Sequence, residues 1–237
     1  MSEITCPICG GHSFSEEFGR PAARCDGCGS VERTRATKLL LDWVVRPTPA
    51  ARVLHIGPEP DLSQHFRATL GASYDPATLK PRNPAEGERV FDPAVDLDEL
   101  EPGSLDIVLH HHVVQEVVGN YTIFLQRLHA ALKPGGYHIF SVPISSGYYQ
   151  EDADPRMDRE ERKERFGQSR SQRRFGRSSF DVTLGAVFGL TRSYSLLDHL
   201  LPEIMVAAAV PETVWKLGSN TVFCVRRWAV SAGLPAD

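Results

Sequence analysis

One stretch of the sequence reads as a strand, a helix and a second strand, and it constrains the fold more than any other. Residues 105–109 form an apolar run that is typical of a strand buried on both faces of a sheet. Asn120 can cap a helix with apolar positions at helical spacing, and the Lys-Pro-Gly-Gly run at 133–136 ends it. Residues 137–142 then return as a strand. Two strands joined through one helix form a right-handed crossover almost without exception, so this stretch predicts a parallel sheet.

Further elements can be placed around this unit. Apolar runs predict five more strands, at residues 52–56, 73–75, 89–91, 190–196 and 220–226. Helices are expected at 61–70 and 179–188, because a glycine that tolerates positive φ follows each of them. The sequence therefore predicts an α/β fold on a doubly wound, mostly parallel, seven-stranded sheet. Such sheets bind their ligands at the carboxyl ends of the strands.

The amino-terminal segment carries four of the five cysteines in two Cys-x-x-Cys pairs, Cys6 with Cys9 and Cys25 with Cys28. In a reducing compartment, this spacing indicates metal rather than disulfides, although unligated thiols or a redox pair are alternatives. Four thiolates form a closed tetrahedral zinc site with no open position for substrate, so the metal is expected to be structural. With so few large apolar side chains, the segment needs the metal to fold.

The cysteine spacing and the apolar pattern divide the chain into three parts. We expect a zinc ribbon at residues 1–30, a linker helix at 31–50 and a Rossmann-like domain at 51–237. The linker helix should run over 31–45 with Trp43 on its apolar face. Its arginines, Arg33 and Arg35, could contact an anionic ligand, but arginines on a helix usually face solvent, and we expect that of these two.

Composition excludes some classes of protein. A hydrophobic content of 41% suffices for one sizeable core. The net charge of -4 argues against a surface that is basic all round, which makes RNA a less favoured partner than a small molecule. No apolar run approaches the roughly 20 residues that span a bilayer, and no signal peptide is evident, so a cytoplasmic protein without membrane contact is expected.

Several motifs together resemble a known family. The strand with an internal Asp, the histidine-containing loop, the helix and the Leu-Lys-Pro-Gly-Gly run resemble the second half of class I S-adenosylmethionine-dependent methyltransferases. The resemblance extends over nearly the whole chain to a subset with C-P-x-C-G, E-R-x-R, L-H-x-x-P-E and F-G-Q segments, matched at residues 6–10, 32–35, 54–59 and 166–168. It implies S-adenosylmethionine as the cofactor and an antiparallel pair that closes the sheet.

The resemblance also implies where the cofactor binds. The expected contacts are Gly57, Pro58, Glu59, Asp75, Thr78, Asp96, Leu97, His110 and His111. The first three form the turn after the first strand, where His55 stands at the position of the usual acid. Asp75 closes the expected second strand, while the subset has its ribose-binding acid at the position of Thr78, so both remain candidates. Asp96 and the amide of Leu97 match the segment that holds adenine, and the two histidines should lie near the methionine end.

The catalytic candidates follow the central strand. His112 should lie near the transferring methyl group, and Glu116 stands in the same loop. The subset reads H-V-x-E-H-V here, whereas this chain has Gln115 and Glu116 in place of the Glu and the His. Three consecutive histidines could suggest a metal, but neighbours in an extended segment point to alternate sides and cannot share one ion.

Two segments after the strand at 137–142 are candidates for the acceptor site. The loop at 145–152 supplies hydroxyls and carboxylates, including Tyr148 and Tyr149, and the segment at 165–177 contains five arginines and no acid. Arg173 and Arg174 are the candidates there, because guanidinium groups suit phosphate or carboxylate. The Asp-His pair that follows F-G-Q in the subset is absent.

The sequence thus predicts S-adenosylmethionine-dependent methyl transfer to a small polar or anionic acceptor, such as a sugar-like molecule or another metabolite. Two alternatives remain. One is a non-catalytic, methyltransferase-like binding or partner subunit, which the altered loop motifs favour; the other is a zinc-ribbon RNA methyltransferase. The ribbon could also contact a protein partner.

Overall fold

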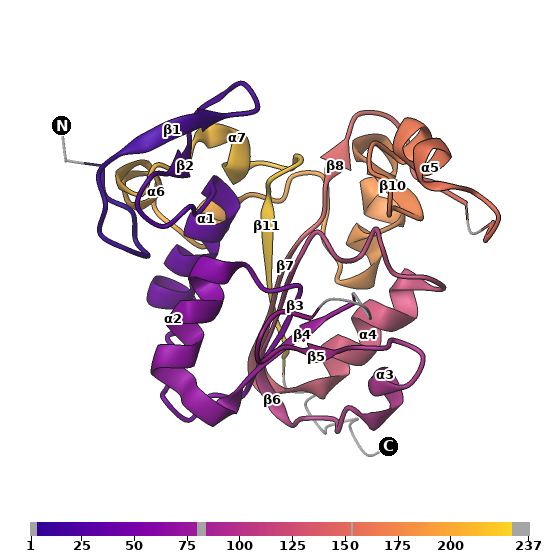
Figure 1. Cartoon of the computed structure of the whole chain (residues 1–237), viewed down its shortest axis with the longest axis horizontal. Helices are drawn as coiled ribbons and strands as arrows, with labels where there is room; N and C mark the ends of the chain where they lie inside the picture. Colours follow the sequence, from indigo (N-terminus) through magenta and orange to yellow (C-terminus); the bar gives the residue numbers. More distant parts are fainter. Residues whose placement is uncertain (1–3, 80–83, 153, 229–237) are drawn as a thin grey trace, which may run out of the picture.

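The computed structural model describes residues 4–79, 84–152 and 154–228 (Figure 1). At its centre lies a six-stranded sheet in the order β11-β7-β6-β3-β4-β5. The strands are β3 Val53–Ile56, β4 Tyr74–Thr78, β5 Arg89–Val90, β6 Leu105–His111, β7 Leu132–Ser141 and β11 Val222–Arg226. Strands β3 to β7 all run parallel to one another, and β11 runs antiparallel to β7. The predicted methyltransferase-like α/β fold with a mostly parallel central sheet is confirmed.

Helices cover both faces of the sheet (Figure 1). One face carries α1 Glu32–Leu40, α2 Pro60–Leu70, α6 Pro202–Ala207 and α7 Glu212–Trp215, and the other carries α3 Asp96–Glu99 and α4 Tyr121–Ala131. Alternate strand residues therefore enter different cores: Val108 packs in the cluster that contains Phe124, and Ile107 in the cluster that contains Phe66. The sheet strands read as nearly continuous apolar runs because both of their faces are buried.

The central crossover has the helix start that the sequence predicts. Oδ1 of Asn120 accepts hydrogen bonds from the backbone N–H groups of Thr122 at 2.9 Å and Ile123 at 3.3 Å. These bonds satisfy two of the donors that the first turn of α4 leaves without helical partners. The helix thereby begins where β6 and its loop end, and it returns the chain to β7.

A smaller layer follows the central sheet. It contains β8 Ile144–Ser145, β9 Gln150–Glu151 and β10 Arg173–Gly176, in the order β8-β10-β9, together with helix α5 Arg159–Phe166. A reciprocal capping box between Asp158 and Glu161 starts α5, and Gly167 at φ +82° ends it. Figure 1 shows this layer and the amino-terminal hairpin at the same end of the molecule, on opposite sides of the sheet.

The amino-terminal hairpin consists of β1 Phe14–Glu17 and β2 Arg20–Cys25. Glu17 pairs with Arg20 across a two-residue turn in which Phe18 and Gly19 both have positive φ, at 53° and 73°. This is the pattern of the turn whose twist matches a β-hairpin. Phe18 is 90% exposed at the tip of the hairpin.

The expected number of sheet strands was wrong by one. Within the described residues the central sheet has six strands, and residues 190–196 form no strand. Ser195 makes an isolated bridge with Lys216, and the 3-10 turn η5 Leu196–Asp198 follows directly. The expected helix at 179–188 is also replaced by 3-10 turns, η3 Arg177–Val182 and η4 Gly185–Val187. Leu184 and Phe180 still enter the core. These apolar residues of the segment are therefore buried, while the prediction of a continuous α-helix was wrong.

Two other expectations about elements need correction. The second strand spans Tyr74–Thr78 after the 3-10 turn η2 Gly71–Ser73, so it ends three residues later than the sequence predicted. Helix α1 passes into the π-helical turn η1 Leu41–Val45, where Trp43 is 53% exposed rather than on a buried face. Among the described residues, no helix is both long enough and apolar enough to span a membrane.

Candidate functional site

The four cysteines of the amino-terminal segment converge on one point. The Sγ atoms of Cys6, Cys9, Cys25 and Cys28 all lie within 4.8 Å of one another. Two of the separations are 3.7 Å, between Cys6 and Cys28, and 3.6 Å, between Cys9 and Cys25. Zinc–sulfur bonds of about 2.3 Å at tetrahedral angles require sulfurs roughly 3.8 Å apart. The donor set and its geometry therefore fit a tetrahedral zinc ion.

The two cysteine turns are built alike. The N–H of Gly10 donates to the carbonyl of Cys6 at 2.9 Å, and the N–H of Gly29 donates to the carbonyl of Cys25 at 2.8 Å. Both glycines have positive φ, at 75° and 81°, which explains why glycine follows each pair. Oγ of Ser30 lies 3.1 Å from Sγ of Cys28 and supports it from outside the ligand set.

The arginines of helix α1 do not face solvent, which corrects the expectation from the sequence. Arg35 has no exposed surface, and its five N–H donors all reach backbone carbonyls, those of Ala22, Ala23, Ser30, Ala208 and Ala209. The first three belong to the amino-terminal segment, and the last two directly follow α6. Helix α1 is thus packed between the ribbon and the main domain and is no free linker.

The turn after β3 lies at the carboxyl edge of the sheet. Gly57 has φ +69°, and its N–H donates to the carbonyl of Ala77 at 2.7 Å. A Cβ atom at this position would lie 3.1 Å from Cγ2 of Val113, in the loop after β6. The backbone of this turn therefore comes close to the neighbouring strand end, and Pro58 then leads into helix α2.

Glu59 is the charged centre of this edge. Its side chain is 14% exposed, with Oε1 3.6 Å from Nε of Arg33 and Oε2 3.4 Å from Nε2 of His55. Burial acts to raise the pKa of Glu59, but His111, His55 and Arg33 outweigh it and lower the pKa to about 2. The carboxylate is therefore ionised at neutral pH.

Several buried polar atoms around Glu59 have no hydrogen-bond partner among the described residues. They are Nε of Arg33, Nε2 of His55, both carboxylate oxygens of Glu59, Oδ2 of Asp61 and Nε2 of His112. The ion pairs that Glu59 makes with Arg33 and His55, at 3.6 and 3.4 Å, do not have the geometry of hydrogen bonds. Such atoms are rare in folded proteins unless a ligand, ion or water satisfies them. The set thus marks a cluster of polar atoms at the amino end of α2 that lack hydrogen-bond partners among the described residues.

The three consecutive histidines point to different places. His110 is fully buried, and its Nε2 lies 2.9 Å from Nε2 of His138, among phenylalanines of the core. His111 instead contacts Thr37 of α1 at 3.0 Å and Ser141 of β7 at 2.9 Å. His110 is therefore directed into the core on the α4 side, while His111 belongs to the edge beside α1.

His112 takes a conformation of its own at the end of β6. Its φ is +52°, which is uncommon for a residue with a side chain and turns the chain into the next loop. Burial lowers the pKa of His112 to about 3, so the ring is neutral at neutral pH. Nε2 of the neutral ring has no hydrogen-bond partner among the described residues, so it can take part in a hydrogen bond with a ligand, but the low pKa makes the ring a weak base.

The acids expected at the adenosine end of the cofactor are held by one arginine. The guanidinium of Arg89 donates to Asp75 at 3.0 Å and to Asp96 at 3.1 Å. Asp75 is the second residue of β4, so it does not lie at the expected strand end; Thr78 does, and it is buried. The side chain of Leu97 is buried in the core. Residues 80–83, between β4 and β5, lie outside the described residues.

Glu116 lies beside a cavity at the same edge of the sheet. The cavity, of ≈ 480 Å³, lies between the end of β4 and helix α5, and Leu79, Met157, Arg159 and Arg170 are among its lining residues. Oε2 of Glu116 is 3.0 Å from Nη2 of Arg170. Glu116 stands where the resembled subset has a histidine, and Arg170 where it has an aspartate, so the two altered positions form an ion pair with each other.

The arginine expected to bind an anion has a structural role instead. Arg173 is 1% exposed, and all five of its N–H donors are used by the carbonyls of Val114, Val117 and Gly119 and by the carboxylate of Glu151. No donor remains for a substrate, so the expectation for Arg173 is contradicted. The side chain instead fixes the loop after β6 against β9.

The other acceptor candidates differ from one another in exposure. Tyr148 is 71% exposed, whereas the hydroxyl of Tyr149 donates to Glu151 at 2.6 Å. Nε of Arg174 is buried without a hydrogen-bond partner among the described residues. Among these candidates, Arg174 and the hydroxyl of the exposed Tyr148 keep donors that an anion could use.

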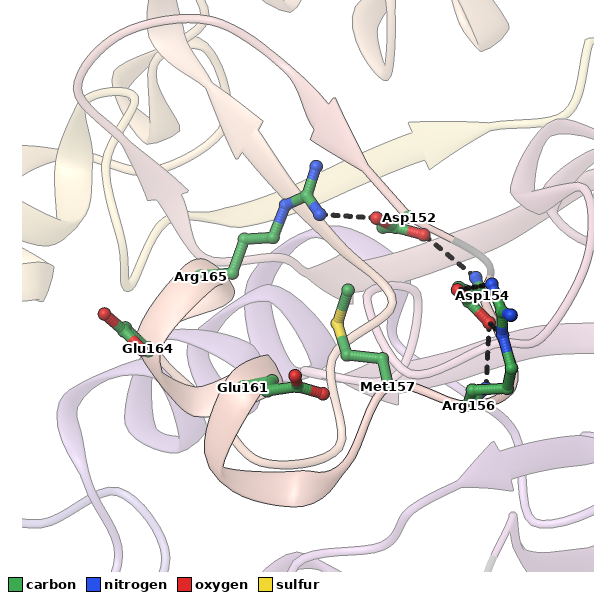
Figure 2. A pocket seen from close by; sticks show the side chains of 7 residues that line it. All are labelled: Asp152, Asp154, Arg156, Met157, Glu161, Glu164 and Arg165. Carbon is green, nitrogen blue, oxygen red and sulfur yellow. Dashed lines mark hydrogen bonds and ion pairs between the residues drawn. The ribbon is translucent and has the colours of Figure 1, made fainter.

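A second cavity, of ≈ 810 Å³, lies between α5 and the segment before it (Figure 2). Arg165 points from α5 toward Asp152, with which it pairs, and Arg156 pairs with Asp154 at 2.8 Å. Glu161 and Glu164 complete a lining in which acids outnumber arginines. The arginines here are neutralised, so this cavity is no anion site.

Comparisons with known proteins were made for the sequence and for the fold. No protein-family model matches the sequence, and no curated protein matches it. Among solved structures, the chain is similar to a Burkholderia thailandensis 1,6-didemethyltoxoflavin-N1-methyltransferase, with 19% identity over 84% of this chain and 79% of the other, at a TM-score of 0.49. It is also similar to an S-adenosylmethionine-dependent methyltransferase from Archaeoglobus fulgidus, with 16% identity over 51% and 56% and a TM-score of 0.38. A third is Haemonchus contortus phosphoethanolamine N-methyltransferase 2, with 18% identity over 59% and 33% and a TM-score of 0.39.

Proposed function

We propose that the chain binds S-adenosylmethionine beside Gly57 and transfers its methyl group to a small polar or anionic acceptor. The observation that carries this proposal is the set of buried polar atoms without partners around Glu59. The methionine end of the cofactor has an ammonium group and a carboxylate. An ionised Glu59 suits the first and the guanidinium of Arg33 suits the second, since charge-assisted hydrogen bonds are the stronger kind.

The remaining contacts follow the edge of the sheet toward the adenosine end. Thr78 ends β4 and can reach the ribose, and the backbone amide of Leu97 can reach adenine beside Asp96. Asp75 would take part only if it left Arg89. Pro58 shapes the turn, and His111 contributes by holding Thr37 of α1 in place.

His110 and His112 have separate parts in the proposal. His110, which is turned into the core, supports the end of β6 and makes no direct contact with the cofactor. Bound cofactor would supply an electrophilic methyl group on a sulfonium, so alignment of the acceptor accounts for much of the acceleration. A ring whose pKa lies near 3 is a weak base, so we assign His112 a hydrogen bond that orients a hydroxyl or amine acceptor rather than the uptake of its proton.

The acceptor is assigned to the cavity beside Glu116. This cavity offers apolar contact at Leu79 and Met157, a carboxylate paired with Arg170, and the exposed side chain of Arg159. Glu116 would orient the acceptor rather than take a proton, because its charge is already engaged by Arg170. Such a mixed lining suits a small polar molecule that carries an anionic group better than the many phosphates of an RNA chain.

A second candidate function is that of a non-catalytic binding or partner subunit. It is favoured by Arg89, which pairs with both acids that the adenosine end would use. In this function a protein partner would bind the ribbon; the exposed Phe18 at the hairpin tip is a single apolar residue and adds no support.

Calorimetric titration of the purified chain with S-adenosylmethionine, with its demethylated product S-adenosylhomocysteine and with NAD distinguishes the two functions. The proposal expects saturable binding of the first two ligands and none of NAD, because the ionised carboxylate of Glu59 suits the ammonium of an amino acid and repels a pyrophosphate. Absence of binding for all three would reject methyl transfer and favour the partner subunit.

A further inference from the structure

Helix α1 lies between the two sites and contacts both. Arg35, at its centre, reaches the ribbon and the segment around α6, while Arg33 and Thr37 reach the carboxyl edge of the sheet. The side chains of Arg33 and Thr37 are four positions apart, and Oγ1 of Thr37 also donates to the carbonyl of Arg33 at 2.9 Å. One helical face therefore supplies both contacts to the proposed cofactor site.

The zinc ligands are joined to this helix by a short series of contacts. Cys28 contacts Oγ of Ser30 at 3.1 Å, and the carbonyl of Ser30 accepts a hydrogen bond from Nη1 of Arg35 at 2.7 Å. The carbonyls of Ala22 and Ala23 in β2 accept two more, at 3.0 and 3.1 Å. Three of the five donors of one buried guanidinium thus depend on the folded ribbon.

Loss of the ribbon would leave a buried charge without partners. Burial lowers the pKa of Arg35, yet a guanidinium stays protonated, so the side chain must follow its acceptors or move to water. Because Arg35 is two residues from Arg33 and two from Thr37, such a movement displaces α1 at the cofactor edge. The ribbon itself has too small an apolar core to keep its shape without metal.

We propose that Arg35 is a positioning residue through which zinc binding in the ribbon sets the affinity of the cofactor site. With zinc bound, the ribbon fixes Arg35, and α1 holds Arg33 beside Glu59 and Thr37 beside His111. Without zinc, α1 shifts and the methionine end of the cofactor loses its partner from this helix. The proposal rests on the proposed function in so far as it names S-adenosylmethionine as the ligand.

The test compares the full chain with zinc, the same chain after removal of zinc by a chelator, and the variants Arg35→Met and Arg35→Lys. Calorimetry measures the affinity for S-adenosylmethionine, and hydrogen exchange measures protection of residues 32–40. We expect zinc removal and Arg35→Met each to weaken the affinity by about tenfold or more. This is the change expected when a ligand loses one hydrogen bond to a charged group. Arg35→Lys should restore part of the affinity.

A matched control separates positioning from general loss of stability. Arg227 also donates to two backbone carbonyls, those of Ala130 and Leu132, but it lies at the opposite edge of the sheet. Arg227→Met should lower the melting temperature and leave the affinity of the folded chain unchanged. An equal loss of affinity in Arg227→Met and Arg35→Met would overturn the positioning role.

The effect of the cofactor on zinc affinity is a measurement that a merely structural role of Arg35 would leave unchanged. If zinc raises the affinity for the cofactor, the cofactor must raise the affinity for zinc by the same factor. Transfer of zinc to a competing chelator should therefore become less favourable when S-adenosylmethionine is present. An unchanged zinc affinity, in a chain that binds the cofactor, would contradict the coupling.

The outcomes also distinguish this proposal from the proposed function. If the zinc-loaded chain does not bind S-adenosylmethionine, the proposed function fails and the coupling is judged by hydrogen exchange alone. Loss of protection at residues 32–40 after chelation, with the amide hydrogen exchange of β6 unchanged, would support the coupling. Unchanged protection of that helix would reject it.

Discussion

Nε of Arg33 lies 3.6 Å from Oε1 of Glu59, so a helix outside the crossover units contributes a positive charge to the turn after β3. This contact joins the helix that follows the four-cysteine segment to the carboxyl edge of the sheet. It also leaves both groups short of hydrogen bonds, which a ligand with one cation and one anion would complete.

Gly57 and Gly71 offer a matched pair of substitutions. Both have positive φ, at 69° and 53°, so alanine strains the backbone at both positions, by about 1–3 kcal/mol. At Gly57 the added Cβ meets Val113 at 3.1 Å, whereas at Gly71 no atom lies within 4 Å. We expect Gly57→Ala to weaken binding of S-adenosylmethionine, measured by calorimetry, and Gly71→Ala to leave it unchanged. Equal affinities in the two variants would show that the cofactor does not approach Gly57.

The ribbon should hold one zinc ion per chain. Cys25→Ser removes one ligand and is expected to unfold the ribbon, while Cys224→Ser changes a buried cysteine of the core and should keep the metal. Elemental analysis of the purified proteins measures the zinc content. A parent chain without stoichiometric metal would refute the site.

Arg173 should matter for stability and not for anion binding. Arg173→Met leaves Glu151 and three carbonyls without their donor, and a loss of about 3 kcal/mol or more in the free energy of unfolding is expected. Arg156, whose side chain is 88% exposed in its pair with Asp154, serves as the control, because Arg156→Met should change stability little. Urea denaturation gives both values. A stability loss no larger for Arg173→Met than for the control would disprove the structural role.

The buried histidines should make the fold sensitive to acid. Burial lowers the pKa of His110 to about 3, and the pKa of His138 well below its usual range near 6.5. Between pH 6.5 and pH 3 the unfolded chain binds protons on these histidines that the folded chain excludes. The contribution of the two residues to stability is therefore full above about pH 6.5 and falls as the pH drops toward 3. Each histidine contributes a slope of up to about 1.4 kcal/mol per pH unit.

The double variant His110→Phe/His138→Phe tests this origin of the acid sensitivity. It replaces both members of the 2.9 Å Nε2–Nε2 contact with rings that carry no proton. Denaturation curves between pH 7 and pH 4.5 should show a shallower loss of stability than the parent. The same slope in both proteins would place the acid sensitivity elsewhere.

The parts of the fold that the sequence predicted depend on local patterns. The crossover from β6 to β7 is read from apolar spacing and from the cap at Asn120, and each cysteine turn is complete within five residues. Gly57 could be found in the same way, because a tight turn after a strand is a local feature. These signals need no knowledge of distant segments.

The parts that the sequence could not predict depend on distant partners. Arg35 reaches a carbonyl 173 residues away, and Arg173 reaches one 59 residues away, so neither looks different from a surface arginine in the sequence. Arg89 was overlooked for the same reason, since its two acids are identified only when β4 and β5 pair. The ER-x-R segment at 32–35 was the one available signal for the roles of Arg33 and Arg35.

The central claim is that Glu59 and Arg33 bind the methionine end of S-adenosylmethionine, and a paired titration tests it most directly. Calorimetry compares S-adenosylmethionine with 5′-methylthioadenosine, which lacks the amino acid group, on the parent and on Glu59→Gln. The account predicts that the parent binds S-adenosylmethionine more tightly, that Glu59→Gln loses about tenfold or more of that affinity, and that 5′-methylthioadenosine binds both proteins equally. Equal binding of S-adenosylmethionine by the parent and Glu59→Gln, or no binding by the parent, would contradict it.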